Sequence, residues 1–142
     1  MKMNSSILII DDETWGVKSL AECIELSTDN VIHVDIAQTI EQAINLIEIN
    51  KYSAILCDLM MPPEIFSFNG EILIFHEPNS LNGRKIIEYC INNGISKKTK
   101  IIVTSIAFQA SLELIEEYKG EIDILRKPFL VEDLLNKINN AH

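Results

Sequence analysis

The sequence predicts an α/β domain with a parallel, doubly wound central sheet covered by helices on both faces. Short runs of Ile, Leu, Val and Ala recur along the 142 residues, and stretches with helical spacing of apolar residues separate them. Several runs are apolar without interruption, as is typical of strands buried on both faces of a parallel sheet. Alternating elements of this kind connect by right-handed crossovers. We therefore expect five parallel strands in the order 2-1-3-4-5, flanked by helices.

Five segments are the expected strands. They are residues 7–10, 31–37, 54–57, 101–103 and, with a weaker pattern, 122–125. The first, third and fourth contain only apolar residues, as expected of strands covered on both faces of a parallel sheet. Nothing in the sequence suggests a repeat or a linker, so residues 1–142 are expected to form one domain.

Amphipathic stretches between these runs predict the helices. The apolar residues at helical spacing are Val17, Leu20, Ala21 and Ile24 in one stretch and Ala43, Ile44 and Ile47 in another. Thr39 is followed three residues later by Gln42, a pattern that predicts a capping box at the start of the second helix. A last helix is expected over 131–138, where the apolar residues again share one face.

One segment breaks the alternation after the third strand. The stretch before the next helix exceeds the roughly 2 to 6 residues usual for such a connection. Within it, Asn69-Gly70 separates two β-prone runs, 65–68 and 71–75. Asn-Gly favours a tight hairpin because both turn residues must adopt positive φ. The sequence therefore predicts a β-hairpin inserted over approximately residues 63–79.

The overall charge limits the classes of partner. The chain has 12 Lys and Arg against 21 Asp and Glu, a formal net charge of −9. Such a chain repels nucleic acid and anionic membrane surfaces, so we expect direct binding to neither. Divalent cations and basic partners are favoured instead.

Three further features predict a cytoplasmic protein. Residues 1–6 lack the pattern of a secretion signal, and no run approaches the roughly 18 apolar residues of a membrane span. Cys23, Cys57 and Cys90 have no metal-binding or redox spacing, and each lies among apolar neighbours. We interpret them as buried free thiols in a reducing compartment.

Acidic residues follow two of the expected strands. Asp11, Asp12 and Glu13 come directly after the first strand, and Asp58 follows the third. In the order 2-1-3-4-5, these strands flank the point where the strand order reverses, and ligands bind there at the carboxyl ends. Carboxylates in one cleft repel one another unless a cation offsets them, and oxygen ligands suit Mg²⁺. The sequence therefore predicts a magnesium site.

Two further groups should reach the same crevice. Thr104 and Ser105 follow the fourth strand, and Lys127-Pro128 follows the fifth. Together with Asp58 and a metal, a hydroxyl and an ammonium group suit phosphoryl transfer to a carboxylate nucleophile. Taken singly, the aspartates and hydroxyls could be helix caps and Lys127 a surface lysine. Only their convergence supports the chemical interpretation.

The chain resembles the receiver domains of bacterial response regulators over nearly its whole length outside the insertion. The matching segments are ILIIDDE (7–13), CDLMMP (57–62), NG (82–83), IIVTS (101–105) and KPF (127–129). Each is weak alone, but together, in order and at the ends of the expected strands, they are specific.

The resemblance implies a signalling function. Asp58 would accept a phosphoryl group from a histidine kinase or phosphotransfer protein in a Mg²⁺-dependent reaction. The domain would then change shape and signal to a downstream protein partner. It would not be an enzyme acting on other substrates, because it would catalyse only its own phosphorylation and dephosphorylation.

The resemblance also implies roles for individual residues. Asp12, Asp58 and the backbone carbonyl of Met60 would ligate Mg²⁺ directly, with Asp11 acting through water. Thr104 would hydrogen-bond a phosphoryl oxygen.

Lys127 would pair with the phosphoryl group, and the bond between it and Pro128 would be cis. The family usually has an aromatic residue three positions before this lysine, where the present chain has Ile124. This difference leaves open how Thr104 communicates with the rest of the domain, unless aliphatic repacking replaces the aromatic ring.

Two alternatives stay open from the sequence. One is a receiver-like interaction module that works without phosphorylation and uses the hairpin. The hairpin would either fold back on the domain's own helices or dock a second copy, forming a homodimer, or another partner. The other is a phosphatase of the haloacid dehalogenase kind, but that class needs an acid two residues after the nucleophile, where Met60 stands.

Overall fold

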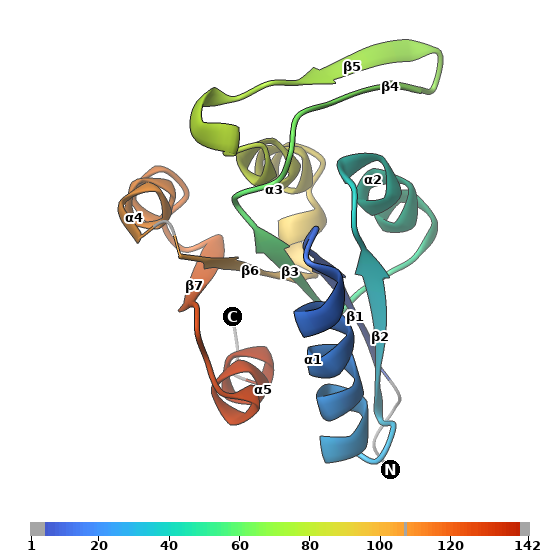
Figure 1. The fold of residues 1–142 in the computed structure, drawn as a ribbon, viewed down its shortest axis with the longest axis vertical. Coiled ribbons are helices and arrows are strands. Elements are labelled where there is room, and N and C mark those ends of the chain that lie inside the picture. The colour runs from blue at the N-terminus through green and yellow to red at the C-terminus, as the bar shows by residue number, and fades with distance from the viewer. Residues whose placement is uncertain (1–4, 107, 140–142) are drawn as a thin grey trace.

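A parallel sheet with helices on both faces forms the frame of the molecule (Figure 1). The computed structural model describes residues 5–106 and 108–139. The sheet consists of β1 (Ser5–Ile10), β2 (Ile32–Ala37), β3 (Ala54–Asp58), β6 (Lys100–Ser105) and β7 (Ile122–Arg126). Neighbouring strands are parallel and follow the order β2-β1-β3-β6-β7. Without the two hairpin strands this is the predicted order 2-1-3-4-5, so the fold class is confirmed.

Helices cover both faces of the sheet. They are α1 (Thr14–Ser27), α2 (Ile40–Ile49), α3 (Gly83–Asn92), α4 (Phe108–Glu117) and α5 (Val131–Asn139). Helices α1 and α5 pack on one face, and α2, α3 and α4 pack on the other (Figure 1). Short 3₁₀ turns precede α3 (Pro78–Ser80) and β6 (Ile95–Lys97). In the part of the chain that the structure describes, no helix is both long and apolar enough to cross a membrane.

Strand β1 shows how an uninterrupted apolar run serves two cores. Ile7 and Ile9 pack in the cluster under α1 and α5, whereas Leu8 and Ile10 pack in the cluster under α2 and α3. All four side chains are at most 3% exposed. Since successive residues of a strand point to opposite faces, only a strand covered on both sides buries them all. Each contributes roughly 1.5–3 kcal/mol through its burial.

The predicted hairpin is present as a separate two-stranded sheet. Strands β4 (Glu64–Phe68) and β5 (Glu71–Phe75) pair antiparallel, with Phe68 opposite Glu71. Asn69 and Gly70 join them with φ angles of 52° and 81°. Both angles lie in the left-handed region that this two-residue hairpin turn requires. Asn and Gly adopt this region readily, which is why the Asn-Gly pair predicted the hairpin.

One face of the hairpin folds back on the domain. Phe66 and Phe75 are each 8% exposed, and their rings stack with centroids 5.6 Å apart. Both belong to the core cluster that includes α2 and α3. The expectation that the hairpin packs on the domain's own helices is therefore confirmed for this inner face.

The first strand of the hairpin is also fastened to the amino end of α2. The Glu64 carboxylate accepts hydrogen bonds from the N–H groups of Ile40 at 2.5 Å and Glu41 at 3.2 Å. Thr39 Oγ1 accepts from the N–H of Gln42 at 3.1 Å, as the capping box predicted. A carboxylate at a helix amino terminus meets unpaired N–H groups and the positive end of the helix dipole. Glu64 thus caps a helix that begins 24 residues before it.

The cysteine prediction is correct for two residues and wrong for the third. Cys57 and Cys90 are buried free thiols, and Cys23 is free but exposed. The residues that α1 buries are Val17, Ala21 and Ile24, which follow a helical stripe. Cys23 lies off that stripe although Ile24 is its neighbour in sequence. Burial raises the pKa of Cys90 to about 12, which keeps this thiol protonated.

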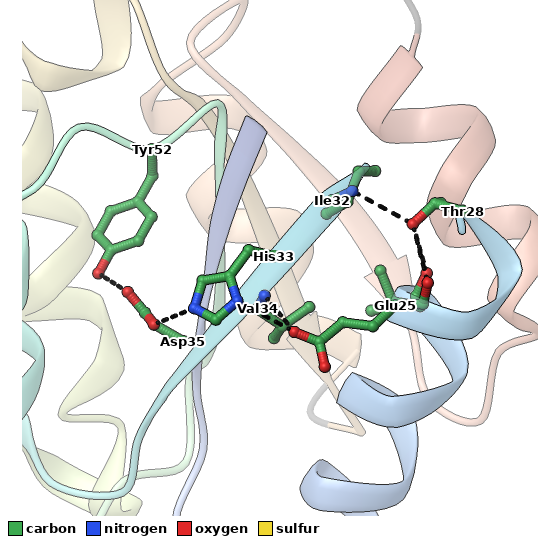
Figure 2. A network of polar contacts seen from close by, with 8 residues as sticks. Glu25, Thr28, Ile32, His33, Val34, Asp35 and Tyr52 are labelled. Atoms are coloured by element: carbon green, nitrogen blue, oxygen red, sulfur yellow. Dashed lines mark hydrogen bonds and ion pairs between the residues drawn. The ribbon is translucent and has the colours of Figure 1, made fainter. Parts of the chain in front are cut away.

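A polar network joins β2 to α1 and to the segment before β3 (Figure 2). The Tyr52 hydroxyl donates to Asp35 Oδ2 at 2.7 Å. His33 contacts Asp35 through Nε2 at 3.0 Å and Glu25 through Nδ1 at 3.2 Å. Glu25 also accepts from the backbone N–H of Val34 at 3.1 Å. The network stabilises β2, the outer strand of the sheet.

We expect Tyr52→Phe to lower the free energy of unfolding by about 1–2 kcal/mol at neutral pH, because Asp35 loses a buried donor. Burial and the Asp35 carboxylate raise the pKa of Tyr52 above its ordinary value of 10.0. The unfolded chain therefore ionises this group first, and its contribution disappears as the pH rises above about 10. Urea unfolding at several pH values should show a steeper loss in wild type than in the variant. Parallel curves would contradict this role.

Candidate functional site

Three aspartates meet at the carboxyl ends of β1 and β3, as the sequence predicted. Asp11 and Asp12 follow β1 directly, and Asp58 is the last residue of β3. Each offers a carboxylate oxygen, and these oxygens all lie within 4.8 Å of one another. Asp11 and Asp58 are buried, whereas Asp12 is exposed. Glu13, which follows the pair, is exposed as well.

Lys127 completes the cluster from the segment after β7. Its ammonium Nζ donates to Asp11 Oδ2 at 2.7 Å and to Asp58 Oδ2 at 3.1 Å. The backbone N–H of Lys127 donates to the carbonyl of Ser105 at 3.2 Å, which ties this segment to the end of β6. The Lys127-Pro128 bond is cis, as the resemblance implied.

The two buried aspartates are held in the same way. Asp58 Oδ1 accepts from the backbone N–H of Met60 at 2.9 Å, and Asp11 Oδ1 accepts from that of Glu13 at 2.9 Å. Such turns, closed by an aspartate onto the backbone two residues later, fix the side chain. In both residues the second oxygen, Oδ2, remains for Lys127. The arrangement therefore presents paired carboxylate oxygens to one cation.

The charges of the cluster fit a divalent cation. Three carboxylates and one ammonium group leave two negative charges in a half-buried crevice, and all of the available ligand atoms are oxygens. Mg²⁺ prefers such hard oxygen ligands and keeps some of its waters, which the exposed side of Asp12 permits. Asp11, Asp12 and Asp58 thus fit the predicted metal.

Burial and charge set the protonation of the two central groups. Burial raises the pKa of Asp58, and Asp11 adds to this effect, while the Met60 N–H and Lys127 partly oppose it. Burial alone would lower the pKa of Lys127, but hydrogen bonds and charge attraction from Asp11 and Asp58 outweigh it, and the pKa rises. Lys127 is therefore a stable ammonium group at neutral pH.

Thr104 lies on the strand next to that of Asp58. It is 4% exposed near the carboxyl end of β6, and its Cα is the register partner of Asp58 on the adjacent strand. Ile124, at the position usually aromatic in the family, lies on β7 next to Val103 and packs on the core under α4. An aliphatic side chain thus occupies the position that is usually aromatic in receiver domains.

A cavity of ≈430 Å³ adjoins the cluster. Its polar lining comes from Asp11, Glu13, Thr104 and Lys127. Apolar residues of α1, β1 and β3, Ile106 and the segment after β7 complete it. A larger hollow of ≈540 Å³ lies beside Tyr52, at the opposite ends of the strands. That hollow contains no acidic cluster, so chemistry and not size identifies the functional site.

Two residues that the motifs contained acquire their physical meaning only in the structure. Asn82 is fully buried, donates to the carbonyl of Met61 at 2.7 Å and accepts from the N–H of Glu77 at 2.8 Å. It therefore closes the two ends of the insertion. The backbone of Gly83 passes so close to Asp58 that a Cβ there would lie 2.0 Å from the Asp58 carbonyl oxygen.

The comparison with solved structures agrees with this architecture. Neither the search with protein-family models nor the search of curated proteins finds a match. Among solved structures, the receiver domain of Francisella response regulator 1452 is 25% identical, with a TM-score of 0.66 over 96% of this chain and 94% of that one. A CheY-like receiver domain protein from Methanospirillum hungatei is 21% identical, with a TM-score of 0.70 over 95% and 90%.

A third similar structure carries the predicted modification. It is a Burkholderia pseudomallei response regulator with a phosphorylated aspartic acid, a calcium ion and citrate. It is 20% identical, with a TM-score of 0.67 over 96% of this chain and 68% of that one. Fold and site define a doubly wound α/β domain with an acidic, lysine-bearing crevice at its switch point. Within that class, this chain has the fold of response-regulator receiver domains, and the resemblance is confirmed.

Proposed function

We propose that the protein is a phosphorylatable signalling receiver in which Asp58 accepts the phosphoryl group. One observation supports this most directly: Lys127 contacts both Asp58 and Asp11, and Asp12 lies beside them. A structural ion pair would need one carboxylate. The additional carboxylates leave a net negative charge that favours binding of a divalent cation. Phosphoryl transfer requires such a cation.

The residues of the cluster have distinct parts in this proposal. An Asp58 carboxylate oxygen forms a bond to phosphorus, and the bond between phosphorus and the donor's histidine nitrogen breaks. The electron pair of that bond stays with the imidazole, and the product is an acyl phosphate on Asp58. The Lys127 ammonium, already beside Asp58, and the Thr104 hydroxyl offset charge on the phosphoryl oxygens.

Asp11, Asp12 and Asp58 would hold Mg²⁺, and the backbone carbonyl of Met60 would add a ligand. When bound, the metal supplies positive charge that offsets the negative charge gathered in the crevice. Asp58 is already oriented by the Met60 N–H, so little rearrangement precedes the reaction.

The partners follow from the same proposal. The donor would be a histidine kinase or phosphotransfer protein, and a downstream protein would read the resulting change of shape. The chain would catalyse only its own phosphorylation and dephosphorylation, without turning over other substrates. Support comes from the fold, which it shares with receiver domains, and from the phosphorylated aspartate of the Burkholderia pseudomallei structure.

Intact-mass measurement after incubation with acetyl phosphate and Mg²⁺ tests the proposal. We expect wild type to gain the mass of one phosphate and Asp58→Asn to gain none. Asp35→Asn serves as a matched control, because Asp35 is a partly buried carboxylate outside the crevice, and it should still be modified.

The other outcomes assign the protein to a different class. An unmodified wild type would contradict the proposal and favour an interaction module that uses the hairpin. Continuous hydrolysis of an added phosphate ester would indicate a phosphatase. A phosphate that persists in Asp58→Asn would place the acceptor elsewhere.

A further inference from the structure

The outer face of the hairpin is an exposed apolar surface. Ile65, Ile72 and Ile74 are 72%, 73% and 65% exposed, and all three lie on the face opposite the buried Phe66 and Phe75. Ile65 and Ile74 stand directly opposite each other in the strand register. Single exposed apolar residues are ordinary, but three β-branched side chains on one small ribbon form a patch.

The same residues carry the unpaired backbone of the hairpin. Directly opposite residues in an antiparallel pair alternate between hydrogen-bonded and non-hydrogen-bonded positions. Phe68 and Glu71 flank the two-residue turn and form the first hydrogen-bonded pair. The alternation then directs the N–H and C=O groups of Ile72 and Ile74 away from β4. Among residues 5–106 and 108–139, no backbone hydrogen bond reaches this edge.

Strand β5 is the accessible strand of the two. Strand β4 contacts α2, and its Glu64 caps that helix, whereas β5 runs along the side of the hairpin farther from the helices (Figure 1). Natural edge strands usually carry a Lys, a Pro or a bulge that blocks further pairing. Between Glu71 and His76, β5 has none of these, and its residues Ile72 to Phe75 are uncharged.

We propose that the β5 edge pairs with β5 of a second copy of this chain. A two-fold axis at Leu73 would place Ile72 opposite Ile74 of the second copy and join the outward N–H and C=O groups of both. The result is a four-stranded antiparallel sheet, β4-β5-β5-β4, with an isoleucine surface contributed by both copies. Closed two-fold pairing of this kind needs no other protein.

The size of the surface favours a strand as the occupant. Five residues at about 3.4 Å each give an edge only about 17 Å long. A single strand edge of this length offers far less contact area than the roughly 800 Å² that each partner of a stable globular complex buries. A single extended strand fits such an edge, and an identical β5 satisfies its outward groups in register. The dimer should therefore be weak and depend on concentration.

Charge distinguishes a second copy from a partner of opposite charge. Each chain has a formal net charge of −9, so two copies repel one another at low ionic strength. Self-association should strengthen as salt is added. Binding of a basic extended peptide to the same edge would weaken instead. The pairing does not depend on phosphorylation of Asp58.

Analytical ultracentrifugation of the whole, unphosphorylated chain tests the pairing. We expect the average mass to rise from 16.1 kDa towards twice that value with concentration, and to rise further with salt. Ile74→Lys should remain monomeric over the same range. Ile49→Lys is the matched control, because Ile49 is 77% exposed at the end of α2, and this variant should associate like wild type.

A cross-linking variant tests the register. In a Cys23→Ser background, Leu73→Cys should form a disulfide-linked dimer on mild oxidation, because the axis brings the two copies of residue 73 together. Circular dichroism should confirm that each variant is folded. A monomeric wild type, a dimer that survives Ile74→Lys, or association that weakens with salt would overturn the proposal.

Discussion

Gly83→Ala should destabilise the protein by at least about 3 kcal/mol, or prevent folding. A Cβ at this position would lie 2.0 Å from the carbonyl oxygen of Asp58 and 2.8 Å from the Cα of Leu59. Both are backbone atoms of a buried segment, so no side chain can rotate to relieve the overlap. Relief would need α3 to shift away from β3, which would also displace Asp58.

Gly16→Ala provides a matched control within the first turn of another helix. The three atoms nearest to its Cβ would all belong to the Glu13 carboxyl group, with Oε1 at 2.8 Å, and this group is the end of an exposed and flexible side chain. Alanine stabilises a helix relative to glycine by roughly 0.5–1 kcal/mol, so this variant should equal or exceed wild type in stability. Urea unfolding of both variants measures the contrast. A Gly83→Ala protein within about 1 kcal/mol of wild type would contradict the close approach.

Asp58→Asn should make the metal-free protein more stable by about 1 kcal/mol and remove its stabilisation by Mg²⁺. Three carboxylates crowd the crevice, and burial raises the pKa of Asp58 above its ordinary value of 3.8. A raised pKa means that the folded state favours the neutral acid. The ionised side chain therefore costs stability at neutral pH, and the neutral amide avoids that cost. The advantage of the variant should vanish at a pH below about 3.8, where Asp58 of the unfolded chain is protonated too.

Thermal unfolding with and without Mg²⁺ measures both effects. At a Mg²⁺ concentration of about 100 times the dissociation constant, wild type should gain roughly 2.7 kcal/mol, and Asp58→Asn should gain much less. Asp123→Asn is a suitable control, because Asp123 pairs with Lys137 at 3.0 Å outside the crevice. It should respond to Mg²⁺ like wild type. An undiminished response in Asp58→Asn would place the metal elsewhere.

Local patterns were sufficient for several elements. The run Ile7 to Ile10 is apolar at every position because both faces of β1 are covered, so the pattern alone indicated a strand buried on both faces. Asn69-Gly70 predicted the hairpin because positive φ at two successive residues is a local requirement. The hydrogen bond from the N–H of Gln42 to Thr39 was predictable as well, because it spans only three residues.

The acidic crevice was predictable by a topological rule. Asp11 and Asp58 are far apart in sequence, but the order of a doubly wound sheet brings the ends of their strands together. Lys127 followed the last expected strand, so the same rule brought it to the crevice. Roles that rest on the resemblance alone, such as the Met60 carbonyl as a ligand, stay predictions.

The exposure of Cys23 follows from the helical periodicity of α1 and not from its neighbours in sequence. Cys23 was expected to be buried because apolar residues surround it in sequence, and it is exposed. The stripe Val17, Ala21 and Ile24 defines the buried face of α1, and a residue one position away turns by about 100° from it. The helical period itself therefore indicates that Cys23 is exposed.

The sequence by itself determined the strand order, the hairpin turn and the residues that meet at the crevice, because these follow from hydrophobic periodicity, turn chemistry and chain topology. Only the tertiary structure decided that Glu64 caps α2, that Asn82 closes the insertion and that β5 keeps an open edge. Those contacts join residues whose distance depends on how whole elements pack. A side chain such as Glu64 has the same local sequence whether it faces water or the end of a helix, so its partner is set by packing.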